Sequence, residues 1–314
     1  MGQIDWDAPR TEEGLQLVLS RLKECRAAGN LVETGNGLLA LGFLVKWVRS
    51  DTARSPFERA HELALEALEV FRRAGDKSGQ VRALVAASAM ADPQAREKFL
   101  AEAEKLSEGL GDENLIAKAL YARARALALS DRKRATELHR QVLEIYRRTG
   151  NQKGLAQCYF SLSIGEGERA EKRDYALEAA RLYRTLGNPT EASRCMSVAI
   201  MNAEEIEPLA DLEDLAKQGL QDALDGASRS QERHFYTKLA LIASAKGQSE
   251  EAEKYGRWAA DLEDSDGLTP RERWKNEVDM TKTMIAMMKA QGHKDAAKPF
   301  EEELKRLKAS KPKS

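Results

Sequence analysis

Glycine followed by asparagine or aspartate recurs along this chain at intervals typical of a repeat structure. The pairs are Gly29-Asn30, Gly75-Asp76, Gly111-Asp112, Gly150-Asn151 and Gly187-Asn188, with Gly226 at a sixth position. Successive glycines of this set are 46, 36, 39, 37 and 39 residues apart. Glycine just past a helix end adopts the left-handed conformation that caps that helix, and Asn or Asp caps the next one. The spacing therefore predicts stacked helical units of about forty residues.

The unit between Gly150 and Gly187 shows what each repeat contains. In residues 151–165 the side chains of Ala156, Tyr159, Leu162 and Ser163 recur at helical spacing, which places them on one face. Residues 169–186 carry a second helical pattern, formed by Ala176, Ala179, Ala180, Leu182 and Tyr183, with charged residues on the opposite face. Two amphipathic helices in succession predict a helical hairpin.

Two segments carry a resemblance to a known family. The stretch GLAQCYFSLS, residues 154–163, resembles the first helix of a tetratricopeptide repeat, whose pattern is A-x-x-L-x-x-L-G. The stretch KGQSEEAE, residues 246–253, resembles the turn and second helix of the same family. The spacing is nearer to the variety of about forty residues in kinesin light chains and bacterial signal-sensing regulators. The resemblance implies an all-α, right-handed α-solenoid, or superhelix, of about seven antiparallel hairpins.

Composition and length agree with a solenoid and set its predicted limits. Hydrophobic residues make up 42% of the 314 residues and prolines number 8, which suits helices that each bury one face. We expect residues 1–28 to form an N-terminal lead and a capping helix, with residues 1–9 unstructured. Residues 29–308 are predicted to form the repeat solenoid, and residues 309–314 a short, basic, disordered tail.

Charge and cysteine content indicate a cytoplasmic protein that binds neither nucleic acid nor membrane. The formal net charge is −1, so no global field attracts polyanions. The longest apolar run, residues 37–45, is too short to span a bilayer. Cys25, Cys158 and Cys195 form no C-x-x-C motif, which favours free thiols in a reducing compartment.

The predicted binding surface follows from the resemblance, since stacked first helices line the concave side in that family. Counting each first helix from its leading small residue, such as Ala156, positions 2, 5 and 9 share a face away from the packing positions. We call this set of positions the ligand face. Its predicted partner-binding residues are Arg82, Lys118, Tyr121, Arg125, Gln157, Phe160, Arg194, Met201 and His234. Cations beside apolar groups suit an acidic, hydrophobic peptide or helix of another protein. The alternative is that each long cation only solvates its helix.

Two other surfaces compete with the ligand face. Met284 and Met288 lie in a late helical pattern rich in methionine, which adapts to irregular contacts. Trp47 follows an apolar helix. Exposed, these residues would form a secondary interface for a partner or a second copy through the terminal caps; buried, they would complete the core.

Catalytic and metal-binding patterns are absent from the sequence. His61, His139, His234 and His293 are far apart and lack ligand spacing to cysteine or to each other. We therefore expect no enzyme activity, metal or cofactor. The predicted function is a protein–protein interaction scaffold or adaptor that docks a partner segment in the groove. The alternative is a regulatory sensor that encloses a small molecule or short signalling peptide at Tyr121 and Phe160.

Overall fold

The computed structural model describes residues 6, 11–46, 56–263, 274–275, 278, 281–282, 285 and 294–309. Across these residues the regular secondary structure is α-helix, and no strand occurs among them. The predicted all-α fold class is therefore confirmed.

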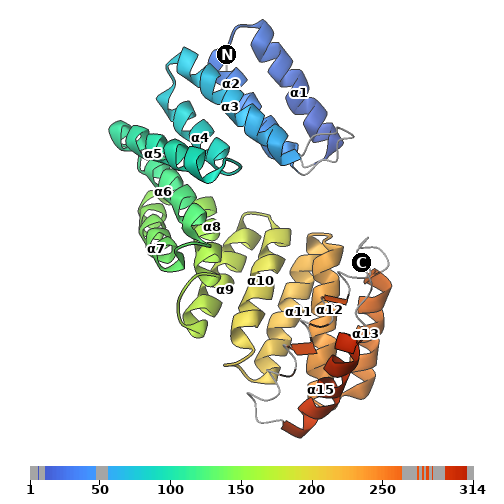
Figure 1. The fold of residues 1–314 in the computed structure, drawn as a ribbon. Helices are drawn as coiled ribbons and strands as arrows, with labels where there is room; N and C mark the ends of the chain where they lie inside the picture. The colour runs from blue at the N-terminus through green and yellow to red at the C-terminus, as the bar shows by residue number, and fades with distance from the viewer. Residues whose placement is uncertain are drawn as a thin grey trace. The chain divides into compact units, whose positions relative to one another are not determined.

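The chain divides into two compact units, Met1–Asn151 and Gln152–Ser314 (Figure 1). Unit 1 contains α1 (Glu12–Ala27), α2 (Leu31–Leu44), α3 (Pro56–Ala74), α4 (Lys77–Ser88), α5 (Pro93–Leu110), α6 (Glu113–Leu127) and α7 (Arg132–Thr149). Unit 2 contains α8 (Gln152–Ser163), α9 (Arg169–Thr185), α10 (Pro189–Ala203), α11 (Leu209–Asp225), α12 (Arg229–Ala245), α13 (Ser249–Glu263) and α15 (Lys294–Ala309).

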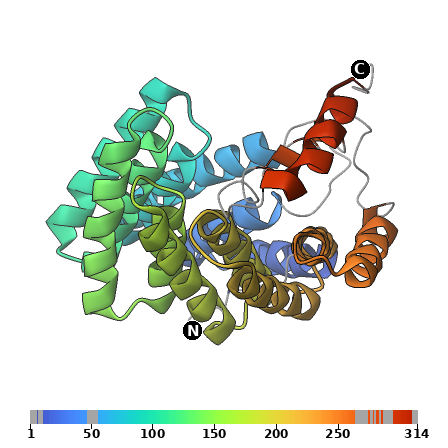
Figure 2. The same cartoon turned by 90° about the horizontal axis from the view of Figure 1, so that it is seen from below.

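Helices in both units pack as consecutive antiparallel pairs. In unit 1 these hairpins are α2 with α3, α4 with α5, and α6 with α7. In unit 2 they are α8 with α9, α10 with α11, and α12 with α13, and the pairing can be followed in Figures 1 and 2. The first helices of neighbouring hairpins also touch within each unit, as α2 touches α4 and α8 touches α10. The positions of the ligand face are therefore presented by neighbouring first helices.

The glycine boundaries behave as the sequence predicts, with one exception. Glycines 29, 75, 111, 150 and 187 all have a left-handed φ between 66° and 70°. The side chains of Asn30, Asp76, Asp112 and Asn188 accept backbone N–H groups at the following helix starts. Gly226 differs, because its φ is −88° and Ala227 takes the left-handed conformation, with φ 47°. Gly226 is instead required by close packing, because a Cβ there would lie 2.7 Å from the Thr190 hydroxyl.

Each unit buries its own apolar residues between paired helices. The largest side chains with under 2% exposure are Leu38, Leu63, Phe71, Leu84 and Leu100 in unit 1, and Leu162, Met196, Ile200, Leu212, Phe235 and Leu239 in unit 2. Removing one such side chain from water stabilises the fold by about 1.5–3 kcal/mol before entropy is counted. At the far end of unit 2, the Trp274 indole donates to the Leu307 carbonyl of α15 at 2.6 Å.

Candidate binding surface

The predicted ligand-face residues lie on five of the first helices. Arg82 is on α4, Lys118, Tyr121 and Arg125 on α6, Gln157 and Phe160 on α8, Arg194 and Met201 on α10, and His234 on α12. Position 9 is the most accessible of the three positions. Phe43, Ile164 and Met201 occupy it with exposures of 43%, 49% and 50%, and Arg125 occupies it in α6, also exposed. The face therefore offers both apolar groups and a cation to solvent.

In unit 1, α6 carries an aromatic ring between two cations. Lys118 and Arg125 are exposed on either side of the partly buried Tyr121. The Tyr121 ring packs on the buried His139 ring of α7, with centroids 5.1 Å apart. Among the described residues, Arg125 forms no ion pair. Its guanidinium is thus available to an anion from outside the chain.

The buried histidine under this surface is neutral at physiological pH. The Nδ1 of His139 is 2.9 Å from the carbonyl oxygen of Ala135, and the side chain is 4% exposed. Burial, followed by the positive charge of Arg125, lowers the pKa of His139 to about 4. An anion bound beside Arg125 would offset part of that repulsion.

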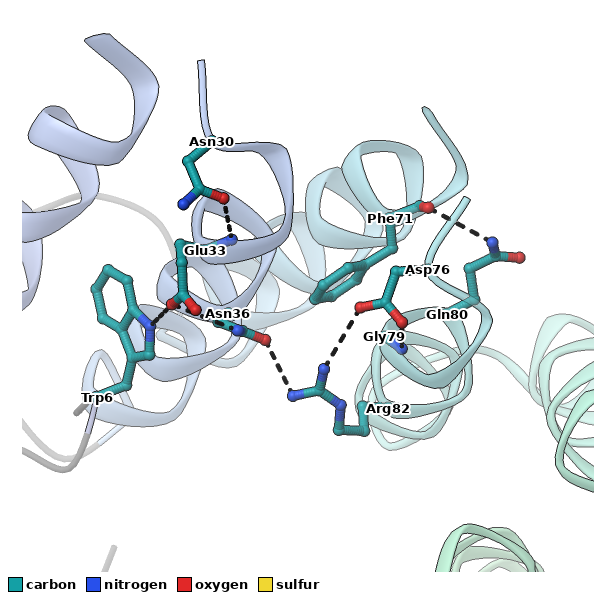
Figure 3. A network of polar contacts seen from close by, with 9 residues as sticks. All are labelled: Trp6, Asn30, Glu33, Asn36, Phe71, Asp76, Gly79, Gln80 and Arg82. Carbon is teal, nitrogen blue, oxygen red and sulfur yellow. Dashed lines mark hydrogen bonds and ion pairs between the residues drawn. The ribbon is translucent and has the colours of Figure 1, made fainter. Parts of the chain in front are cut away.

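Arg82 is held by neighbouring groups within unit 1, as Figure 3 shows. Its guanidinium donates to Oδ1 of Asn36 on α2 at 3.0 Å and lies 3.8 Å from the Asp76 carboxylate. It also lies over the Phe71 ring, 5.4 Å from the centroid. Asn36 and Asp76 were not predicted as site residues. The sequence offered one signal for the contact with Asn36: an amide at position 2 of one first helix is followed by a cation at position 2 of the next first helix.

Two glycines allow Phe71 to pack where Arg82 is positioned. A Cβ on Gly35 of α2 would lie 2.6 Å from the Phe71 ring, and a Cβ on Gly79 of α4 would overlap the same ring. Phe71 is fully buried, so the ring cannot move aside without disturbing the core. The glycines therefore set how closely α3 approaches α2 and α4.

In unit 2, Arg194 and Phe160 were predicted as separate ligand contacts, yet they contact each other. The Arg194 guanidinium lies 5.5 Å from the Phe160 ring centroid and 2.7 Å from Glu191 one turn earlier. The arginine side chain remains 48% exposed. Cation and ring thus form one composite surface on which a ligand would meet both groups.

The apolar part of the unit 2 face joins the ends of α8 and α10. The Asn202 side chain donates to the Ser163 carbonyl at 3.2 Å, which ties these helix ends together. Ile164 and Met201, the neighbours of these two residues in sequence, are about half exposed. This arrangement presents two large apolar side chains from adjacent hairpins to solvent.

His234 and Gln157 contribute less accessible surface than the cations. The His234 Nε2 is buried and has no hydrogen-bond partner among the described residues. Burial, then the charges of Lys238 and Arg233, lower the pKa of His234 to about 4, so the ring is neutral. Gln157 is partly buried and already interacts within the chain.

The secondary interface residues Trp47, Met284 and Met288 lie outside the described residues. Among the described residues, no group of three or more His, Cys, Asp or Glu side chains is placed to hold a metal ion. None of the described helices has the length and apolar character to cross a membrane.

Comparisons with known proteins find similarity in structure alone. No protein-family model matches the chain, and no curated protein matches it. A signal transduction ATPase with numerous domains (STAND protein) from Pyrococcus horikoshii, which has a tetratricopeptide repeat sensor, aligns with a TM-score of 0.58. The two are 15% identical over 80% of this chain, which spans 39% of the ATPase.

A second solved structure is similar over most of both chains. It is a Rap protein complexed with competence and sporulation factor, with a TM-score of 0.54 and 12% identity over 88% of this chain and 76% of the Rap protein. At such identities the likeness establishes the fold. With consecutive antiparallel hairpins, left-handed glycine boundaries and these structural matches, the chain has the fold of a tetratricopeptide-repeat-like protein.

Proposed function

We propose that this protein is a scaffold or adaptor that binds an acidic, apolar segment of another protein on its ligand face, without catalysis of its own. The observation that carries the proposal is the α6 surface, where exposed Lys118 and Arg125 flank Tyr121. Neighbouring arginines such as Arg123 and Arg148 pair with glutamates of their own unit, whereas Arg125 has no such partner among the described residues.

Charged and apolar residues of the ligand face would contact different groups of the ligand. A ligand carboxylate at Arg125 would form a charge-assisted hydrogen bond, which is stronger than a neutral one. Ile164 and Met201 would receive aliphatic side chains, and the Arg194–Phe160 surface would accept a carboxylate above an apolar ring. Within each unit, several contacts would be needed for a specific interaction, because the cost of ordering the ligand reduces the gain from each contact.

The structural neighbours support binding as the class of function. The Rap protein was solved with competence and sporulation factor bound, and the Pyrococcus protein carries its repeats as a sensor. Helical repeat folds present extended surfaces, which suits them to binding.

A peptide-display experiment tests the proposal. Random twelve-residue peptides would be selected on the wild-type chain, on a Lys118→Glu/Arg125→Glu/Arg194→Glu variant, and on a Lys105→Glu/Arg147→Glu/Arg181→Glu variant. The control changes the net charge equally, on second helices. We expect wild type and control to enrich peptides rich in Asp, Glu and aliphatic residues, and the ligand-face variant to lose them. Enrichment that survives the ligand-face reversal would refute the site.

The sensor alternative requires that the rings of Tyr121 and Phe160 are open to a small molecule. The ring of Tyr121 already packs on His139, and that of Phe160 already packs under Arg194. A small molecule bound at either ring would have to use the face of that ring that remains open within its own unit. Thermal stabilisation by a metabolite library, with no peptide enrichment, would favour the sensor over the scaffold.

A further inference from the structure

The indole of Trp6 is built closely into the surface of unit 1. Its Nε1 donates to Oε2 of Glu33 on α2 at 2.6 Å. A Cβ on Gly37 would lie 2.6 Å from Cη2 of the indole, so the ring rests directly on the glycine backbone. Leu22 of α1 borders the same position, 3.1 Å from that Cβ. We call the surface formed by Leu22, Glu33 and Gly37 the indole site.

At Trp6 this contact differs from the expectation that residues 1–9 are unstructured, while residues 1–5 and 7–9 lie outside the described residues. Trp6 is partly buried and packs against the core cluster of unit 1. Gly37 leaves room for the aromatic ring and Glu33 supplies the acceptor that an indole N–H requires, since a buried tryptophan needs a polar partner. The site thus selects a flat ring with a hydrogen-bond donor on its edge.

Hydrogen bonds connect the indole site to the ligand face, as Figure 3 shows. The Glu33 oxygen that accepts from Trp6 also accepts from Nδ2 of Asn36, at 3.5 Å. Oδ1 of Asn36 accepts from Arg82, at 3.0 Å. Occupancy of the indole site therefore helps to fix the Asn36 amide, and with it the direction in which Arg82 is presented.

The sequence around Trp6 has the chemistry that the ligand face was predicted to bind. It reads Ile4-Asp5-Trp6-Asp7, an apolar and acidic segment. A segment with the character of the proposed ligand thus places its aromatic side chain at one end of the chain of hydrogen bonds that leads through Glu33 and Asn36 to Arg82.

We propose that the indole site is a ligand-binding site that the chain fills with its own Trp6, and that it takes a tryptophan flanked by carboxylates from a partner protein. The acidic, apolar character of this ligand rests on the proposed function; the tryptophan comes from the geometry of the site. Because the chain's own tryptophan is tethered, its effective concentration is high, and a partner binds only by displacing it. Trp6 therefore sets a threshold affinity that a weakly binding partner does not reach.

The test adds the segment around Trp6 as a separate peptide to the 314-residue chain. A fluorescein-labelled peptide with the sequence of residues 2–9, GQIDWDAP, and its counterpart with alanine for tryptophan would be titrated against wild type and Trp6→Ala by fluorescence anisotropy. We expect the tryptophan peptide to bind Trp6→Ala at least about tenfold more tightly than wild type, because the tethered competitor is gone. The alanine peptide should bind neither. Equal affinity for both chains, or no binding to Trp6→Ala, overturns the proposal.

A matched variant identifies the site of binding. In Trp6→Ala/Gly37→Ala the new Cβ occupies the space of the indole, and no ring is left for it to strike. This double variant should fold like Trp6→Ala, as judged by circular dichroism, and lose at least about tenfold in affinity for the peptide, the loss expected when about 1.4 kcal/mol of contact is removed. Retained binding would place the peptide elsewhere and overturn the indole site.

A second measurement covers the case in which Trp6→Ala does not fold. The wild-type chain would be labelled with 5-fluorotryptophan, and the Trp6 resonance assigned from its loss in Trp6→Phe. Titration with the unlabelled peptide should move the Trp6 signal towards that of the free amino acid. A signal that stays constant up to millimolar peptide shows a fixed structural contact and overturns the proposal.

The experiments distinguish failure of the indole site from failure of the proposed ligand face. Peptide binding to Trp6→Ala that persists after Lys118→Glu/Arg125→Glu keeps the indole site and removes α6 from the binding surface. If Lys118→Glu/Arg125→Glu abolishes both peptide binding to Trp6→Ala and the display enrichment, the indole site and the α6 surface bind the same ligand.

Discussion

Arg82 in unit 1 and Arg194 in unit 2 occupy the same position of their repeats, yet the two guanidiniums are used differently. Arg82 reaches across to Asn36 of the preceding hairpin and to Asp76, and its side chain is 33% exposed. Arg194 pairs with Glu191 of its own helix and is 48% exposed. Both cover an aromatic ring, Phe71 or Phe160.

The difference follows from the residue at position 2 of the first helix in the preceding hairpin, and from the burial of the aromatic ring under each arginine. In unit 1 that residue is Asn36, whose amide oxygen accepts from Arg82, and the ring of Phe71 is fully buried. In unit 2 the ring of Phe160 is partly exposed, and the arginine turns to an intrahelical partner. Helical position therefore determines the direction of a side chain, while its neighbours decide whether it holds the fold or meets a ligand.

The largest effect is expected where Phe71 supports Arg82. Gly79→Ala should destabilise the protein by about 2–3 kcal/mol, because the added methyl overlaps a buried ring that has no free space to enter. Urea unfolding measures the change. Gly109→Ala is the matched control, since a Cβ at this helical position meets nothing within 4 Å and should be neutral or slightly stabilising. Equal stability of Gly79→Ala and wild type would show that Phe71 is not confined.

His139 and His234 should make both units sensitive to acid. Folding lowers the pKa of His139 and of His234 to about 4, below the value of about 6.5 in an unfolded chain. Between these values the unfolded chain binds more protons, so stability falls as the pH drops through this window. From pH 7 to pH 5 each histidine should cost up to about 2 kcal/mol.

Glutamine at one histidine tests the assignment of this acid sensitivity. His139→Gln in unit 1 and His234→Gln in unit 2 each remove one titrating ring, so each should flatten the pH dependence of urea unfolding by about half. An unchanged slope in both histidine variants would assign the acid sensitivity to carboxylates.

Alanine at the two arginines tests the comparison directly. Arg82→Ala should cost about 1–2 kcal/mol, because it leaves Asn36 without its charged donor and removes cover from Phe71. Arg194→Ala should cost about 0.5 kcal/mol or less, as exposed intrahelical ion pairs contribute little. Chemical unfolding of both variants in parallel measures the difference. Similar losses would mean that the two arginines share one role.

Sequence reasoning predicted the repeats because helix ends have local chemical requirements. Four of the predicted caps, at Asn30, Asp76, Asp112 and Asn188, form through contacts within three residues, which a linear pattern can reveal. The helical period likewise placed Lys118, Tyr121 and Arg125 on one side of α6.

Contacts between residues far apart in sequence could not be predicted in the same way. The Asn36–Arg82 bond joins residues 46 apart, and the Trp6–Glu33 bond joins residues 27 apart. Whether an arginine is free depends on such partners, so the cationic side chains could be predicted as a set but not ranked. Gly37 did carry a signal in the sequence: it is one of three glycines in the helical stretch 31–44, and glycine inside a helix indicates close approach of another group.

A stability change of at most about 1 kcal/mol is expected at the boundary where glycine does not take the left-handed conformation. All four boundaries of unit 1 place glycine in the left-handed conformation, whereas Ala227 of unit 2 takes it with φ 47°. Ala227→Gly should stabilise the protein by about 0.5–1 kcal/mol, because glycine lacks the Cβ that crowds this conformation. Gly187→Ala, at a left-handed glycine of the same unit with nothing near its Cβ, should lose about 1 kcal/mol. Thermal unfolding of this reciprocal pair measures backbone strain separately from packing. If Ala227→Gly destabilised the chain, contacts of the alanine methyl would outweigh the strain, and the rule that explains the unit 1 boundaries would not extend to unit 2.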